Sequence, residues 1–254
     1  MNDGCLLETR PLPGAVLLTL NRPGQHNALN SELIAALKAA FLRLRNDAEC
    51  RVLVLAGAGK SFCAGADLKS MRAKADDTQA LAEMLLALHE LPQPRIALVH
   101  RAAIAGGLGL VAVCDIAIAT SSARFSFPEV RLGLVPAVIS PYVIAAIGLR
   151  ATRALFLTGE NFDAATALRV GLVHRVYPDH EVQQAGLDLV NQLLRHGPAA
   201  LAAVRPLLAH AATRAIDKQL TGWTADYLAQ LRGGAEAQEG MLAVLEHRDP
   251  RWSG

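Results

Sequence analysis

The chain has 254 residues, of which 52% are hydrophobic and 19% are charged, and 25 Lys and Arg against 23 Asp and Glu give a net charge of +2. This composition predicts a globular protein and argues against disorder. No block of basic residues stands out, so nucleic-acid binding through a basic face is not indicated. The most apolar window, residues 102–119, is interrupted by three glycines and Asp115, so we expect no membrane span.

Two further observations concern the compartment. The N-terminal sequence MNDGCLLETR lacks the basic start and apolar run of a signal peptide, so we expect a cytoplasmic protein. The four cysteines, Cys5, Cys50, Cys63 and Cys114, are scattered without the spacing of a metal site, and we expect reduced thiols and no bound metal.

The first half of the chain alternates strands with helices. Residues 5–9 and 15–20 predict a hairpin joined across PLPG, and Ser31 is the predicted N-cap of a helix over 32–46. Residues 52–56 predict a strand covered on both faces, which leads into the loop GAGKSFCAGADLKSM and a short helix from Ala66. Further elements are predicted in chain order: a helix over 78–91, a strand over 95–99, a Gly-rich turn and apolar helix within 101–114, and strands over 115–120 and 123–127.

A strand, a Gly-rich turn and a short helix occur at 52–71 and again at 95–114, which indicates repeated units of one domain. From 133 onwards the sequence is mainly helical. It predicts helices over 138–147, 151–159 and from N-cap Asp163 to Gly171, a strand over 172–177, and helices over 179–195, 198–211, 214–231 and 235–247. We expect a core over 1–195 and a helical region over 196–254.

The two Gly-rich turns each place backbone amides at a predicted helix start, where negative charge is stabilised. The donors would be the amides of Ala66 and Gly106. A phosphate-binding P-loop is excluded because Val54 stands where its first glycine belongs. A dinucleotide fingerprint beginning at Gly107 is disfavoured, because a strand starts at Asp115 and leaves little room for the crossover helix. No G-x-S-x-G elbow or histidine pairing indicates a hydrolase or metal site.

Five motifs in order resemble the enoyl-CoA hydratase/isomerase (crotonase) superfamily: NRPGQHNAL, GAGKSFCAGADLKSM, IAGGLGLVAVCDIAIA, ARFSFPEVRLGLVP and FDAATALRVGLVHRV. The resemblance implies an α/β spiral of β-β-α units with a helical C-terminal region that makes a homotrimer or dimer of trimers. It also implies an acyl-CoA thioester substrate, no separate cofactor, and an oxyanion hole formed by the amides of Ala66 and Gly106.

The acid/base group follows from the same resemblance. Crotonases with two carboxylates carry one at the position of Gly109 and a second in the P-E motif at Glu129, and only the second is present here. We therefore expect Glu129 to be the single acid/base. Ile139 and Ser140 stand where many members have a glycine pair, and with Gly109 they resemble bacterial methylglutaconyl-CoA hydratase-like members.

The expected substrate-binding residues flank the two turns and the P-E motif: Ala64, Gly65, Asp67, Leu68, Gly107, Gly109 and Pro136. For a carboxylated acyl group, such as that of 3-methylglutaconyl-CoA, the candidate cations are Lys69, Arg72 and Lys74. Asp67 and Asp115 are expected mainly to cap backbone amides. Three functions stay open: a hydratase using Glu129 alone, an enoyl-CoA isomerase, and a non-catalytic acyl-CoA binding protein.

Overall fold

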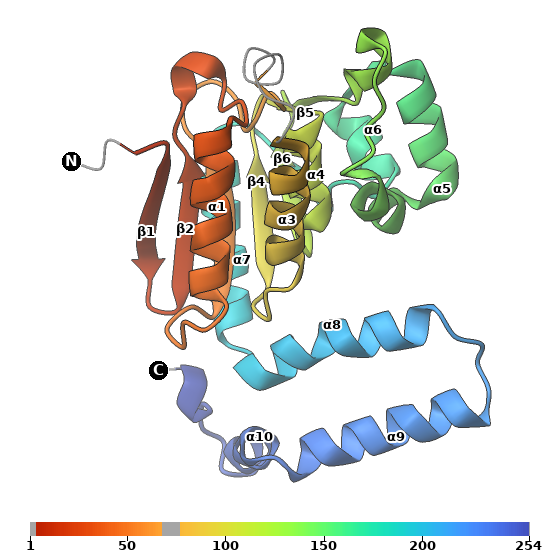
Figure 1. Ribbon diagram of the computed structural model, residues 1–254. Coiled ribbons are helices and arrows are strands. Elements are labelled where there is room, and N and C mark those ends of the chain that lie inside the picture. Colours follow the sequence, from red (N-terminus) through yellow and green to blue (C-terminus); the bar gives the residue numbers. More distant parts are fainter. Residues whose placement is uncertain (1–3, 68–76, 254) are drawn as a thin grey trace.

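The protein, described here by a computed structural model over residues 4–67 and 77–253, is built on a six-stranded sheet (Figure 1). Its strands lie in the order β1-β2-β3-β4-β6-β9. Their bounds are β1 Leu6–Leu12, β2 Ala15–Leu20, β3 Val52–Gly57, β4 Arg95–Val99, β6 Ile116–Thr120 and β9 Arg175–Tyr177. Only the β1–β2 pair is antiparallel among these neighbours, so the predicted N-terminal hairpin is confirmed.

A second, three-stranded sheet explains the spiral. It contains β5 (Ala102–Ile104), β7 (Arg124–Ser126) and β8 (Asn161–Asp163), in that order. An isolated bridge joins Cys63 to Ala103. Each turn of the chain therefore contributes first to the large sheet and then to the small one: β3 precedes Cys63, β4 precedes β5, and β6 precedes β7. The predicted α/β fold of repeated strand-containing units is confirmed.

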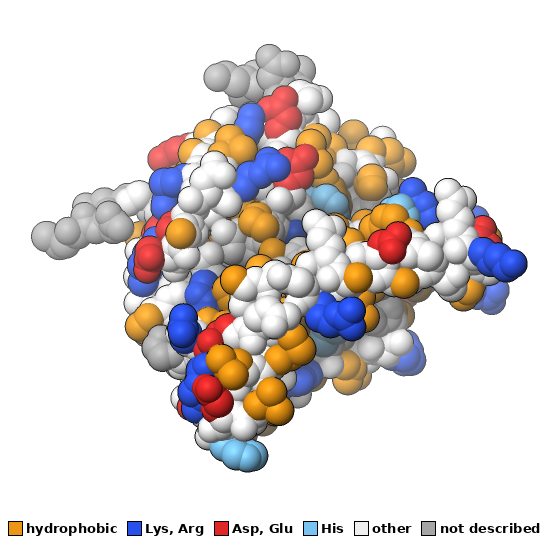
Figure 2. All heavy atoms as spheres, turned by 90° about the horizontal axis from the view of Figure 1, so that it is seen from below, with side chains coloured by type: hydrophobic (Ala, Val, Ile, Leu, Met, Phe, Trp, Pro, Cys, Tyr) orange, Lys and Arg blue, Asp and Glu red, His pale blue; other side chains and the backbone are white. Residues whose placement is uncertain are grey.

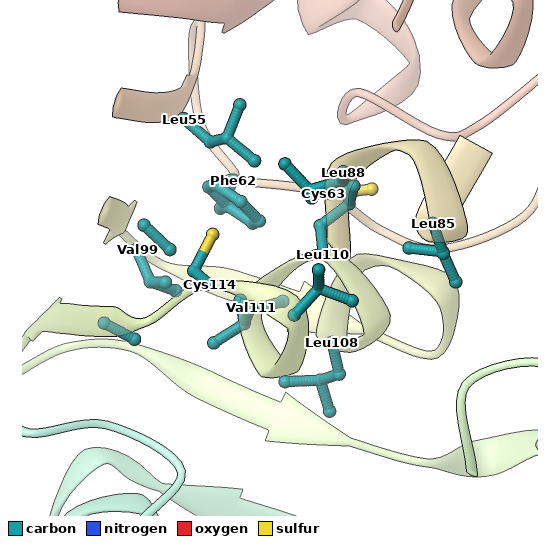
Figure 3. Packing of buried hydrophobic residues seen from close by; sticks show 14 of the residues in the cluster. Leu55, Phe62, Cys63, Leu85, Leu88, Val99, Leu108, Leu110, Val111 and Cys114 are labelled. Carbon is teal, nitrogen blue, oxygen red and sulfur yellow. The ribbon is translucent and has the colours of Figure 1, made fainter. Parts of the chain in front are cut away.

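Helices cover both faces of the large sheet. One core cluster joins the sheet to α1 (Ser31–Leu44), α3 (Asp77–His89) and α4 (Gly106–Val113), and a smaller one joins it to α7 (Val182–Leu194). Within the larger cluster, Figure 3 shows Leu110, Val111 and Cys114 gathered near Phe62 and Cys63. Helix α4, which is buried on nearly all sides, is thus held rigidly behind its first residue, Gly106.

The N-cap of α1 corrects the prediction of Ser31. Asn30 is the cap: its backbone is extended, and its Oδ1 accepts the amide N–H of Leu33 at 3.0 Å. Ser31 is the first helical residue. Strand β1 also continues through Pro11 and Leu12, so the turn is confined to Pro13 and Gly14.

The helices after the P-E motif differ in detail from the prediction. Two predicted helices form one element, α5 (Ser140–Thr158), with a kink at Gly148 where φ is 74°. Asp163 is confirmed as the N-cap of α6 (Ala164–Arg169), because its Oδ1 accepts the Thr166 amide at 2.8 Å. The strand predicted over 172–177 is confined to β9. The three-residue strands β5 and β8 were not predicted.

The last helices lie apart from the large sheet as an extended layer (Figure 1). They are α8 (Pro198–Ala212), α9 (Lys218–Gly233) and α10 (Ala235–Leu245). Their exposed large apolar residues are Val204, Leu208, Leu228, Met241, Leu242, Val244 and Leu245. Figure 2 views the molecule from this side and shows apolar side chains interspersed with charged ones.

None of the helices in the described ranges is long and apolar enough to cross a membrane. Short 3-10 turns occupy Pro23–Gln25, Pro128–Leu132 and Arg251–Ser253.

Candidate active site

The two Gly-rich loops lie side by side at one end of the small sheet. The amide of Cys63 donates to Ala102 O at 3.0 Å, and the amide of Ile104 donates to Cys63 O at 2.9 Å. Glycine is required where the loops come closest. A Cβ on Gly65, whose φ is +88°, would lie 2.8 Å from Ile104 O, and one on Gly107 would lie 2.6 Å from Cys63 O. Both contacts are shorter than real side chains allow, so larger residues would force the loops apart.

This pairing brings Ala66 and Gly106 to the same cavity. Both residues line a cavity of about 430 Å³. Gly106 begins α4 directly after Ala105, whose φ of 48° is unusual for a residue with a side chain. Within the described part of the chain, neither amide donates a hydrogen bond to a backbone acceptor. Two N–H donors with no backbone partner in the described ranges, one at a helix start and one in a neighbouring loop, suit an oxygen that gains negative charge.

Most of the cavity wall is apolar, and most of that wall was not predicted. The contributors are Leu81 of α3, Ile104, and the segment after the P-E motif that includes Leu132, Leu134, Val135, Val138 and Ile139. The signal available in the sequence was the apolar run LVPAVI at residues 134–139, which begins five residues after Glu129. Such a wall accommodates an acyl chain.

Glu129 is the one charged side chain in the described lining of this cavity. It stands in the 3-10 turn Pro128–Leu132, which follows β7 and ends at Gly133 in the left-handed region. Its Oε2 atom is buried and has no hydrogen-bond partner among the described residues. Burial raises the pKa of the Glu129 carboxyl above its ordinary value of 4.5. A carboxyl with a raised pKa in an apolar cavity is suited to accept and return a proton.

The chain is similar to known proteins over most of its length. Residues 13–254 match the family model described as enoyl-CoA hydratase/isomerase. The chain belongs to this family. A 2,3-dehydroadipyl-CoA hydratase from Escherichia coli is 32% identical over 94% of this chain and 95% of its own. A short-chain-enoyl-CoA hydratase from Clostridium acetobutylicum is 30% identical over 91% of each chain.

Solved structures are also similar to this chain over nearly its whole length. An enoyl-CoA hydratase from Shewanella pealeana superposes with a TM-score of 0.93 at 37% identity, covering 99% of this chain and 97% of that one. Pseudomonas aeruginosa AtuE superposes with a TM-score of 0.92 at 37% identity, covering 98% of this chain and 100% of that one. The resemblance inferred from the five motifs is therefore confirmed at the level of family and fold.

The structure brings several predicted site residues together. Ala64, Ala66, Gly106, Glu129 and Pro136 all line the cavity. Gly65 and Gly107 lie where the two loops approach each other. Gly109 is buried within α4, and a Cβ there would meet Ile139. Leu68, Lys69, Arg72 and Lys74 lie outside the described residues.

The two aspartates expected to cap amides have ionic partners. Asp67 pairs with Arg22, Oδ2 to Nη2 at 3.2 Å. Asp115 does accept a backbone amide, that of Arg95 at 2.9 Å, but it also pairs with the guanidinium groups of Arg95 and Arg205. Among the described residues, no cluster of three or more His, Cys, Asp or Glu side chains is arranged to hold a metal ion.

Proposed function

We propose that the chain is a hydratase that adds water across the 2,3 double bond of an enoyl-CoA thioester. The observation that carries the proposal is one cavity that is lined by Ala66, Gly106 and Glu129. The names of the relatives from E. coli and C. acetobutylicum support the same reaction class. Coenzyme A enters as part of the substrate, and the proposed reaction needs no other cofactor.

In the proposed mechanism the thioester oxygen accepts hydrogen bonds from the two amides. Glu129, as a carboxylate, takes a proton from water while the water oxygen forms a bond to C3. The electron pair of the double bond moves toward the thioester and produces an enolate, whose oxygen charge the two donors stabilise by on the order of 3 kcal/mol each. Glu129 then returns its proton to C2, so that the elements of one water molecule have been added and the carboxylate is regenerated.

The finer proposal is that the acyl group is branched and carboxylated, as in 3-methylglutaconyl-CoA. Its support is the resemblance of Gly109, Ile139 and Ser140 to methylglutaconyl-CoA hydratase-like members. The described lining contains no lysine or arginine, and the candidate partners of the tail carboxylate are Lys69, Arg72 and Lys74. Arg72→Ala should then raise KM for 3-methylglutaconyl-CoA far more than for crotonyl-CoA, and equal effects would contradict this proposal.

The deciding experiment is to incubate the protein with 2-enoyl and 3-enoyl CoA thioesters and to identify the products by mass and chromatography. A gain of one water by the 2-enoyl substrate supports the hydratase. An unchanged mass with a moved double bond would instead show an isomerase, and binding without any product would show a non-catalytic acyl-CoA protein. Glu129→Gln should abolish hydration, whereas Glu160→Gln, at an exposed position beyond α5, should not.

We also propose a homotrimer or a dimer of trimers, assembled through α8–α10. Its support is the group of exposed apolar side chains on these helices, which water would otherwise surround. Light scattering on the purified protein tests the assembly. A mass of three or six chains supports the proposal, and a monomer at micromolar concentration contradicts it.

A further inference from the structure

The side chain of Ile139 occupies the space into which any side chain at Gly109 would project. A Cβ built on Gly109 would lie 2.5 Å from Ile139 Cγ2, 3.2 Å from Ile139 Cβ and 3.4 Å from Leu85 Cδ1. Carbon atoms do not approach to 2.5 Å, so a side chain at 109 and the present position of Ile139 exclude each other. The lack of a carboxylate side chain at position 109 therefore leaves the space that the isoleucine at position 139 fills.

Ile139 has little freedom to withdraw from this position. It is 3% exposed and stands at the N-cap of α5, where its carbonyl accepts the amide of Val143 at 3.1 Å. The clashing atom, Cγ2, is attached directly to Cβ, so only rotation about χ1 can move it relative to the backbone. A β-branched side chain also has few alternative rotamers. A larger residue at position 109 would therefore displace the whole side chain of Ile139.

The direction of that push matters because Ile139 also lines the acyl cavity together with Glu129. Other apolar residues of the same wall are much more exposed: Val135 is 69% exposed and Leu132 is 56% exposed. Ile139 therefore belongs to the deep end of the cavity, and Val135 and Leu132 belong to its rim. Removing the side chain of Ile139 would extend the cavity inward, toward the bare backbone of Gly109.

We propose that Ile139, seated on Gly109, is a specificity-determining residue that sets the depth of the acyl cavity and so limits the length of the acyl chain. This inference rests on the proposed function, since it assigns the cavity to the acyl group of a CoA thioester. It predicts that substitutions at positions 139 and 109 change the preference for long acyl chains in opposite directions. Ile139→Ala deepens the cavity and favours longer chains, whereas Gly109→Ala drives Ile139 into the cavity and disfavours them.

The experiment compares crotonyl-CoA with 2-octenoyl-CoA. Because one methylene in an apolar pocket changes specificity about tenfold or more, Ile139→Ala should raise the octenoyl-to-crotonyl ratio of kcat/KM by at least about tenfold. Gly109→Ala should lower this ratio, and the double variant Gly109→Ala/Ile139→Ala should return it above the wild-type value. The matched control is Ile144→Ala, which makes the same change on a 39% exposed residue of α5.

A binding measurement keeps this test independent of hydration. The dissociation constants of butanoyl-CoA and octanoyl-CoA, which have no double bond to hydrate, should shift in the same directions when measured by calorimetry. If the wild type hydrates no substrate but these shifts appear, the proposed function fails and the role of Ile139 stands. If Ile139→Ala leaves both ratios within twofold of the wild type, or changes them no more than Ile144→Ala does, the role of Ile139 is overturned.

Discussion

Arg205 of α8 reaches Asp115 at the start of β6, with Nη2 3.0 Å from Oδ2, and so ties the C-terminal helices to the core. The same guanidinium donates to the carbonyl oxygens of His89, Leu91 and Gln93 at the end of α3 and beyond. Burial alone would raise the pKa of Asp115, but hydrogen bonds and charge from Arg95, with the charge of Arg205, hold it below its ordinary value. Asp115 is therefore a structural carboxylate.

Arg205→Ala should loosen the attachment of α8–α10. Asp115 keeps its pairing with Arg95, so we expect a loss of about 2 kcal/mol in the free energy of unfolding, in the range of hydrogen bonds to charged groups. Urea denaturation measures the loss, and limited proteolysis should show faster cleavage between α7 and α8. Arg232→Ala, at an exposed position of α9, is the control and should cost less than about 0.5 kcal/mol. Equal effects of the two substitutions would contradict the attachment.

Gly107→Ala should impair catalysis more than folding. Its Cβ would lie 2.6 Å from Cys63 O, so the loop that carries the Ala66 amide and the helix that carries the Gly106 amide must separate. Since loss of one oxyanion donor costs about 10²–10³ in kcat, we expect a fall of about 10²-fold with an unchanged far-ultraviolet spectrum. Gly222→Ala is the matched control, because a Cβ there would meet nothing within 4 Å. An unchanged kcat in Gly107→Ala would show that these amides do not take part in catalysis.

The raised pKa of Glu129 predicts the acidic limb of the pH profile. The proposed mechanism begins with Glu129 as a carboxylate, so kcat/KM falls when this group is protonated. Because burial raises its pKa, kcat/KM should reach half of its plateau value at a pH above 4.5, the ordinary pKa of glutamate. Hydration of crotonyl-CoA measured from about pH 4 to about pH 9 tests this expectation. A profile that stays flat down to pH 4.5 would exclude Glu129 as the base.

Local sequence signals predicted the elements whose formation depends on near neighbours. The strands at 15–20 and 95–99 and the N-cap Asp163 belong to this group. The strands β5 and β8 were not predictable from three residues each, because their pairing with β7 decides their conformation. Asn30 and Ser31 are both good caps by type, and only the extended backbone of Asn30 distinguishes them.

Contacts between residues far apart in the sequence account for what the sequence could not predict about the site. Gly109 was recognised as a missing carboxylate, but the residue that fills its space, Ile139, lies 30 positions later and is revealed only by packing. Asp115 was expected to cap amides, and its ion pair with Arg205 spans 90 positions. In both cases the residue type indicated that the position matters, whereas the identity of the residue that it contacts depended on the tertiary fold.

Glu129→Gln should stabilise the protein at neutral pH while abolishing activity. The glutamate is partly buried, and its Oε2 has no partner within the described ranges, so the charged form is disfavoured on folding. A carboxyl whose pKa is raised in the folded state contributes stability below pH 4.5, and this contribution is lost as the pH rises through the folded-state pKa. Glutamine has nearly the same shape and carries no charge at any pH. Urea denaturation should therefore show that the free energy of unfolding of Glu129→Gln exceeds that of the wild type by more at about pH 8 than at about pH 4.5.

The control Glu160→Gln, at an exposed position, should change the free energy of unfolding by less than about 0.5 kcal/mol at either pH. A Glu129→Gln variant less stable than the wild type at the higher pH would mean that the ionised carboxylate has a stabilising partner in the folded protein, and that its burial is not the dominant influence on its proton affinity.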